Sequence, residues 1–185
     1  MRRKKPLILF STYGGHKLGT GHIFRDLELA DMLKCRANVF FHVAGSNGAF
    51  EILHNYGIKQ VVRGSFKRAV QEYCPDLVVY DRPSALGKIE NISNIMRPKI
   101  IALDYFHYDD SLADATINIK NHYLEKSGVR QIPKIYEGTE YAIIREEILK
   151  LKNKKNEVKR KVNNILITFG GADPRNNTQK AMQIL

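Results

Sequence analysis

The chain has 185 residues, of which 43% are hydrophobic and 26% are charged, and its formal net charge is +11. This composition is typical of a folded globular protein and excludes a disordered tail, a collagen-like fibre and a disulfide-rich scaffold. No apolar run reaches the roughly 18 residues that a membrane span needs. The two cysteines, Cys35 and Cys74, form no paired motif, which favours a reducing cytoplasm.

Short apolar segments alternate with helical patterns along the chain. The sequence predicts strands at 7–12, 38–43, 59–62, 77–80, 99–103, 115–119 and 165–169. It predicts helices at 23–33, 49–56, 66–73, 89–96, 141–151 and 176–185. Because apolar strands that alternate with helices form a parallel sheet covered on both faces, we expect an α/β, Rossmann-like fold. Such sheets bind ligands at the carboxyl ends of their strands.

A basic stretch interrupts this rhythm. Eight Lys or Arg residues lie between Arg145 and Lys161, and they account, with four more at residues 2–5, for nearly all of the excess charge. No aromatic residue interleaves Lys150 to Lys161, so the run lacks the stacking platforms of single-strand binders. We interpret it as a solvated helix end and linker and expect no nucleic-acid partner; a nucleic-acid or membrane contact is the alternative.

The position of this stretch suggests a domain boundary. We expect a first domain at 1–149, a basic linker at 150–164, and the first strand–helix unit of a second domain at 165–185. A single such unit cannot form its own sheet. The chain is therefore expected to be the front part of a longer protein, with packing of this unit on the first sheet as the alternative. If the protein does not extend past Leu185, we expect the exposed unit to cause instability or self-association.

The turn after the first strand is rich in glycine. Glycines between a strand and a helix let the backbone approach a phosphate at the helix N-terminus, and here they include Gly19 and Gly21. The P-loop pattern fails because Thr20 stands where a lysine is needed, and the dinucleotide fingerprint fails because Phe24 replaces its third glycine. A flexible turn without a ligand is the alternative.

His22 begins the helix that follows this turn. The helix dipole favours a neutral imidazole there, which can accept a proton near neutral pH, although a lone histidine is more often structural. The other histidines singled out (His42, His54, His107 and His122) show no metal-ligand spacing. We expect neither a metal nor a cofactor.

Two further groups of residues follow predicted strands. Asp81 and Asp104 lie where sugar hydroxyls would be bound, with helix caps or turns as the alternative. Gly170, Gly171 and Asn176 belong to a second strand–glycine–helix turn. Two such turns, one per domain, suggest a ligand held between two sheets.

Four segments carry a resemblance to a known family. Residues 19–30 (GTGHIFRDLELA) are similar to its G-x-G-H-x-x-R-x-L-x-L-A signature, and residues 75–81 (PDLVVYD) to its P-D-x-x-V-x-D strand. Residues 141–147 (YAIIREE) and 167–178 (ITFGGADPRNNT) are similar to its Y-A-L-L-R-x-E-F and S-F-G-G-x-D-x-x-N-x-T segments. Taken in order, they resemble the UDP-2,4-diacetamido-2,4,6-trideoxy-β-L-altropyranose hydrolases (PseG-type) of pseudaminic acid biosynthesis.

The resemblance implies a GT-B architecture, in which two Rossmann-like domains face each other across a cleft and the C-terminal domain grips the UDP. It implies a cytoplasmic, metal-independent hydrolase: water attacks the anomeric carbon of a UDP-sugar and UDP leaves, with His22 as general base. The substrate-binding residues that it implies, together with the strand-end aspartates, are Gly19, Gly21, Arg25, Asp81, Asp104, Gly170, Gly171 and Asn176.

Two positions depart from the family pattern. Pro83 stands where the family usually has a tyrosine, and Asp104 is followed by Tyr105 instead of a second aspartate. Both positions are expected near the sugar, so an enzyme for a related nucleotide sugar is an alternative. A GT-B glycosyltransferase with a UDP-sugar donor and a non-catalytic sugar-nucleotide-binding domain are the other two.

Overall fold

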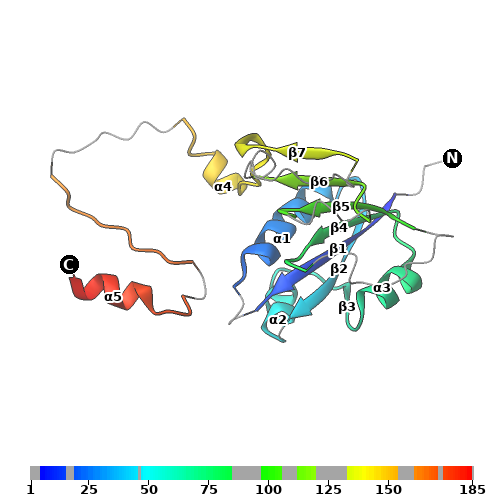
Figure 1. The fold of residues 1–185 in the computed structure, drawn as a ribbon, viewed down its shortest axis with the longest axis horizontal. Helices are drawn as coiled ribbons and strands as arrows, with labels where there is room; N and C mark the ends of the chain where they lie inside the picture. The colour runs from blue at the N-terminus through cyan, green and yellow to red at the C-terminus, as the bar shows by residue number, and fades with distance from the viewer. Residues whose placement is uncertain are drawn as a thin grey trace.

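The described residues form a seven-stranded sheet, whose strands are labelled from β3 at one edge to β7 at the other in Figure 1. The computed structural model describes residues 5–15, 19–45, 47–84, 97–105, 112–119, 133–153, 161–170 and 173–184. Its strands are Leu7–Gly14 (β1), Asn38–Gly45 (β2), Val61–Val62 (β3), Leu77–Asp81 (β4), Lys99–Leu103 (β5), Ala115–Asn118 (β6) and Ile135–Glu137 (β7).

All neighbouring strands of this sheet run parallel, in the order β3-β2-β1-β4-β5-β6-β7. The order reverses at β1, because β2 and β3 continue the sheet on one side of it while β4 and the later strands continue it on the other. This is the arrangement of a doubly wound, Rossmann-like sheet. The predicted α/β fold class is thereby confirmed.

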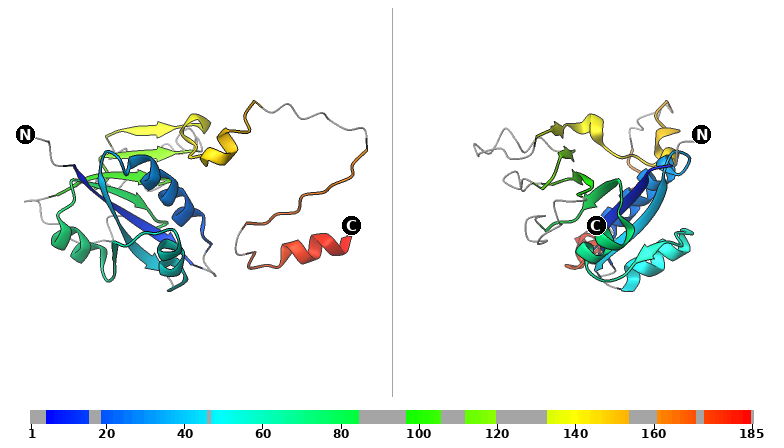
Figure 2. Two further views of the ribbon diagram at one scale, coloured as in Figure 1. Left: turned by 180° about the vertical axis from the view of Figure 1, so that it is seen from behind. Right: turned by 90° about the vertical axis from the view of Figure 1, so that its right-hand side faces the viewer.

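Helices cover both faces of the sheet (Figure 2). The helices Gly21–Leu33 (α1) and Asn47–Asn55 (α2) pack on the face that carries Ile8 and Phe10. The helix Phe66–Tyr73 (α3) packs on the opposite face, which carries Leu9. Successive residues of a strand point to opposite faces, so β1 supplies both cores and is buried on both sides.

Residues 139–149 differ from the helix predicted at 141–151, and that prediction is wrong. A 3-10 turn at Thr139–Tyr141 (η3) is followed by an extended stretch and by a four-residue helix, Glu146–Leu149 (α4). The segment docks on α1, where the Glu146 backbone N–H donates to the Glu28 carboxylate at 3.1 Å. This tertiary contact overrides the helical periodicity of the sequence.

Two strands also differ from the prediction. β7 was not predicted, because it is three residues long and depends on pairing with β6. The strand predicted at 165–169 is wrong: residues 161–170 form no regular element, and no described strand lies alongside to pair with them.

The helix Asn177–Ile184 (α5) follows and lies close to the helix predicted at 176–185. The predicted helix at 89–96 lies outside the described residues. None of the described helices is both long and apolar enough to cross a membrane.

Candidate functional site

The order of the strands reverses at β1, and open α/β sheets bind ligands beyond the carboxyl ends of the strands at such a reversal, here the ends of β1 and β4. Thr12 near the end of β1 is in register with Asp81, the last residue of β4. The turn after β1 and the start of α1 lie at this edge, and Asp104 follows the neighbouring strand β5. Four of the residues singled out from the sequence, His22, Arg25, Asp81 and Asp104, therefore meet here.

The glycine turn is closed by a backbone hydrogen bond from the Gly15 N–H to the Gly19 carbonyl at 3.0 Å. Gly19 has φ +86°, which favours glycine. A Cβ on Gly14 would lie 2.9 Å from the Gly19 carbonyl oxygen, so this position also excludes a side chain. The turn delivers the chain to the start of α1 at Gly21, where Thr20 makes no side-chain cap.

Arg25 and Asp81 form the buried centre of the site. The Asp81 side chain is fully buried, and its two oxygens accept from Arg25 Nε at 2.9 Å and Nη2 at 2.6 Å. Arg25 Nη1 also donates to Asp104. Burial lowers the pKa of Arg25, but the hydrogen bonds and charges of the two aspartates outweigh it and raise that pKa. The guanidinium is thus permanently charged and neutralised by two carboxylates.

His22 completes this group. Its Nδ1 lies 2.7 Å from Asp81 Oδ1 and 3.2 Å from Arg25 Nη2. Because Arg25 can only donate and the carboxylate can only accept, the shorter contact assigns the ring proton to Nδ1, which donates to Asp81. Nε2 then carries the lone pair and makes no hydrogen bond to any described residue. The His22 side chain is 34% exposed, so solvent reaches the ring.

Asp104 is held in an unusual backbone conformation. Its φ is +44°, in the left-handed region that non-glycine residues seldom adopt. Its Oδ1 accepts from the Ile119 N–H at 3.1 Å, and its own N–H donates to the Ile117 carbonyl at 2.9 Å. These bonds to the end of β6 fix the carboxylate that faces Arg25.

Asp26 also lies at this site, although sequence analysis did not single it out. Its side chain is fully buried on the inner face of α1. Neither of its oxygens has a hydrogen-bond partner among the described residues. Burial, and secondly the negative charge of Asp81, raise the pKa of Asp26 well above its ordinary value, which favours the protonated acid. Its position one helical turn after His22 is the signal that could have identified it.

Arg82 and Tyr13 are two further residues at this edge that sequence analysis did not select. Arg82 follows β4 directly, and its guanidinium lies 5.6 Å from the Tyr80 ring centre. The Tyr13 ring packs edge-on against His22, with 6.3 Å between the ring centres. A basic residue that directly follows the carboxyl end of a strand was the available signal for Arg82.

The second glycine turn is not brought to this group. Gly170 and Asn176 have φ of +76° and +52°, and Asp173 begins α5 by accepting from the Asn177 and Thr178 N–H groups at 2.9 and 2.8 Å. Figures 1 and 2 show α5 apart from the sheet. Gly171 lies outside the described residues.

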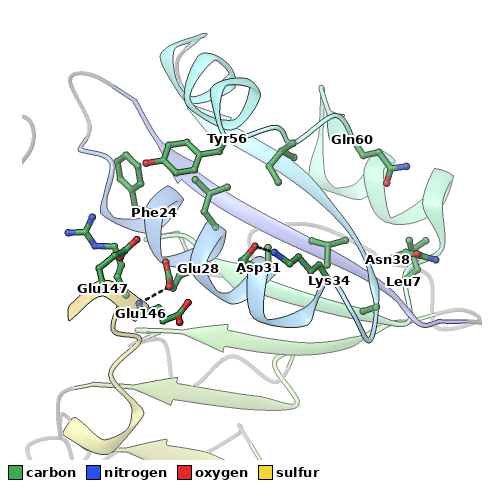
Figure 3. A pocket seen from close by; sticks show the side chains of 16 residues that line it. Leu7, Phe24, Glu28, Asp31, Lys34, Asn38, Tyr56, Gln60, Glu146 and Glu147 are labelled. Atoms are coloured by element: carbon green, nitrogen blue, oxygen red, sulfur yellow. Dashed lines mark hydrogen bonds and ion pairs between the residues drawn. The ribbon is translucent and has the colours of Figure 1, made fainter. Parts of the chain in front are cut away.

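A cavity of about 870 Å³ lies away from this site, beside α1 and the first residues of β1 and β2 (Figure 3). Its lining includes Glu28, Asp31 and Tyr56 together with residues 145–147, and none of the residues predicted to bind substrate. This groove is where the segment around α4 docks. Within the described ranges, no three His, Cys, Asp or Glu side chains gather as a metal site would require.

Comparison with known proteins gives distant relatives. No protein-family model matches the chain. It is 26% identical over 196 residues to the uncharacterized protein MJ1062 of Methanocaldococcus jannaschii, covering 96% of this chain and 39% of that protein. It is 26% identical over 171 residues to the spore coat polysaccharide biosynthesis protein SpsG of Bacillus subtilis, covering 88% of this chain and 50% of SpsG.

Among solved structures, the chain is similar to MurG of Acinetobacter baumannii, with a TM-score of 0.48 and 12% identity over 70% of this chain and 44% of that one. It is similar to a UDP-N-acetylglucosamine 2-epimerase with a TM-score of 0.48 and 10% identity, over 68% of this chain and 46% of that one. The chain is thus distantly similar to SpsG and spans half or less of the length of these curated relatives.

Proposed function

We propose that the chain is the N-terminal part of a GT-B enzyme of polysaccharide biosynthesis that hydrolyses a UDP-(diacetamido-trideoxy) sugar to UDP and free sugar. Residues 1–149 would form the first domain, 150–164 the linker and 165–185 the start of the nucleotide-binding domain. Three observations support the proposal: the residues gathered at the order reversal of a Rossmann-like sheet, the four matched segments, and the similarity to a polysaccharide biosynthesis protein.

The observation that carries the proposal is the contact of 2.7 Å between His22 Nδ1 and Asp81 Oδ1. A histidine whose Nδ1–H donates to a buried carboxylate presents Nε2 as a proton acceptor, and the carboxylate stabilises the imidazolium that forms. Such a pair at the carboxyl edge of a parallel sheet is suited to activate a water molecule or a sugar hydroxyl.

In the proposed reaction, His22 Nε2 takes one proton from water. The water oxygen forms a bond to the anomeric carbon, and the bond from that carbon to the UDP oxygen breaks, so that UDP leaves with the electron pair. Gly19 and Gly21 would shape the loop near the diphosphate. Gly170, Gly171 and Asn176 would line the nucleotide side.

Asp81, Arg25 and Asp104 are proposed to act through His22 instead of by direct contact with the sugar. Both Asp81 oxygens are already bonded within the protein, and Arg25 and Asp104 bond each other. Asp104 would hold Arg25, Arg25 would hold Asp81, and Asp81 would orient the imidazole. These are positioning roles.

The proposal is tested by proton NMR of two samples, this chain and a longer form that includes the proposed second domain. Each is incubated with a UDP-2,4-diacetamido sugar in EDTA, without an acceptor. Release of UDP and free sugar by the long form establishes a hydrolase. Release that requires an added sugar or lipid acceptor assigns a GT-B glycosyltransferase instead. Tight binding of the UDP-sugar without turnover under either condition assigns a non-catalytic binding domain.

A further inference from the structure

Two arginines lie at the carboxyl edge of β1 and β4, and their charges are balanced differently. Arg25 is bonded to Asp81 and Asp104. Arg82 is half-buried, and no carboxylate of the described residues forms an ion pair with it. Its Nε is buried without a hydrogen-bond partner in that part of the chain. Arg82 is therefore a cation that the described protein leaves uncompensated.

The polar contact that Arg82 does make fixes the side chain without neutralising it. Arg82 Nη1 lies 3.5 Å from Ser11 Oγ, which in turn lies 3.2 Å from His42 Nδ1. His42 Nε2 is 3.0 Å from the Gly64 carbonyl oxygen, so Nε2–H donates there and Nδ1 accepts from the Ser11 hydroxyl. The Ser11 oxygen is then left to accept from Arg82.

Every member of this chain of hydrogen bonds is uncharged except Arg82. His42 is buried, and burial, the largest cause, lowers its pKa, with the nearby Arg82 charge acting in the same direction. Burial also lowers the pKa of Arg82, but a guanidinium does not lose its proton in proteins. The relay therefore orients a permanent positive charge and adds no negative one.

An unpaired, partly desolvated cation is unfavourable for folding. It lies where α/β sheets bind ligands, with its guanidinium beside the Tyr80 ring. These features suit a charge that is neutralised when a ligand binds.

We propose that Arg82 binds a phosphoryl group of the ligand at the edge formed by the carboxyl ends of β1 and β4. A planar guanidinium can donate two parallel hydrogen bonds to a phosphate or a carboxylate. The choice of phosphate rests on the proposed function, since a UDP-sugar supplies a diphosphate. Arg25 is not assigned this role because its charge is already paired with two carboxylates, to which Nε, Nη1 and Nη2 each donate.

The test measures binding of inorganic pyrophosphate to the 185-residue chain by calorimetry, and the Tm of the ligand-free chain, for the wild type and for Arg82→Gln. Loss of a charged bidentate contact is expected to weaken binding about tenfold or more. The ligand-free Tm should stay equal or rise, because an uncompensated buried charge is removed. Arg68→Gln is the matched control: Arg68 is 77% exposed on α3 beside Glu72 and should change neither quantity.

Equal pyrophosphate affinity in the wild type and Arg82→Gln overturns the proposal, as does a wild type that binds acetate but not pyrophosphate. A large fall in the ligand-free Tm of Arg82→Gln makes Arg82 structural and also overturns it. If Arg82→Gln does not fold, Arg82→Lys keeps the charge but loses the planar fork, and it should fold and bind several-fold more weakly. Failure of both variants to fold contradicts the proposal.

These outcomes are separable from the proposed function. Hydrolysis by the long form together with Arg82-independent pyrophosphate binding would refute only the inference. Arg82-dependent binding without any UDP release would refute only the hydrolase.

Discussion

At the scale of single residues, the site depends on how negative charge is distributed around one buried carboxylate. Asp81 accepts hydrogen bonds from Arg25 and His22. Asp26 lies nearby, and its raised pKa favours the protonated carboxylic acid. Arg25 bonds both Asp81 and Asp104, one positive charge against two carboxylates, and the imidazole is held by Asp81 through Nδ1, which leaves Nε2 without a partner among the described residues. Each member of this group is expected to have a different effect when it is replaced.

Asp81→Asn should destabilise the protein strongly. Removing one partner of a buried ion pair typically lowers the free energy of unfolding by about 3–5 kcal/mol. Urea denaturation measures this change. Asp31→Asn is the control, because the Asp31–Lys34 pair is largely exposed and its loss should lower the free energy of unfolding by less than about 1 kcal/mol. Equal effects of the two substitutions would contradict the buried pair.

Asp26→Asn should make stability less dependent on pH. The pKa of Asp26 is raised in the folded protein, so as pH rises the unfolded chain loses this proton first and the folded state loses relative stability. The variant should match the wild type near pH 4, close to the ordinary pKa of aspartate. It should exceed the wild type at pH 8 by a few degrees in Tm, at about 2–4 °C per kcal/mol. A Tm difference that is constant between pH 4 and pH 8 would rule out this account.

At the scale of elements, the sequence predicts the helices and strands whose bounds are set by signals in their own residues. α3 and β5 occupy the predicted residues, and α3 has its own signals in the Ser65 cap and the left-handed Cys74 that ends it. The helix predicted at 141–151 fails because its conformation is set by docking on α1, and β7 was missed because it depends on pairing with β6.

The same distinction applies to the site. Placement at strand ends was enough to gather His22, Asp81 and Asp104, since parallel strands present their carboxyl ends at one edge. The pairing of Arg25 with both aspartates, the burial of Asp26 and the uncompensated charge of Arg82 were not predictable. They depend on distances between residues that are 55 or more positions apart, such as Arg25 and Asp81, or on which neighbours exclude water.

Glu28→Ala should loosen the docked segment without unfolding the sheet. The substitution removes the acceptor of the Glu146 N–H, a bond that contributes about 1 kcal/mol. Hydrogen exchange of the Glu146 amide should speed up about fivefold, as measured by NMR. Asp31→Ala is a control in the same groove, because Asp31 bonds Lys34 instead; equal acceleration in both variants would refute the role of Glu28.

At the scale of the whole molecule, the described residues 161–170 and 173–184 carry apolar side chains that nothing in the described chain covers. Val162, Leu166 and Ile184 are 80%, 88% and 85% exposed. The chain spans 39% of MJ1062 and 50% of SpsG. In the proposed function, the rest of a second domain would cover these apolar side chains. The sheet at residues 7–137 has both of its faces packed without this segment.

The isolated chain should therefore self-associate through residues 161–184. Sedimentation at increasing concentration should show association of the 185-residue chain, and Leu166→Glu should weaken it. A chain ending at residue 153 should remain monomeric and keep the wild-type Tm, because the sheet is retained. A full chain that stays monomeric at high concentration would contradict an uncovered apolar segment.

The rate of UDP release in EDTA, without an acceptor, by a longer form that carries the proposed second domain tests whether His22 is the general base of the hydrolysis. His22→Asn should lower kcat by about 10²–10⁴-fold, the usual contribution of a positioned base. Binding of the UDP-sugar should be nearly unchanged, because the imidazole acts on water and not on the nucleotide. Wild-type turnover by His22→Asn would show that the pair formed by His22 and Asp81 is not the catalytic centre.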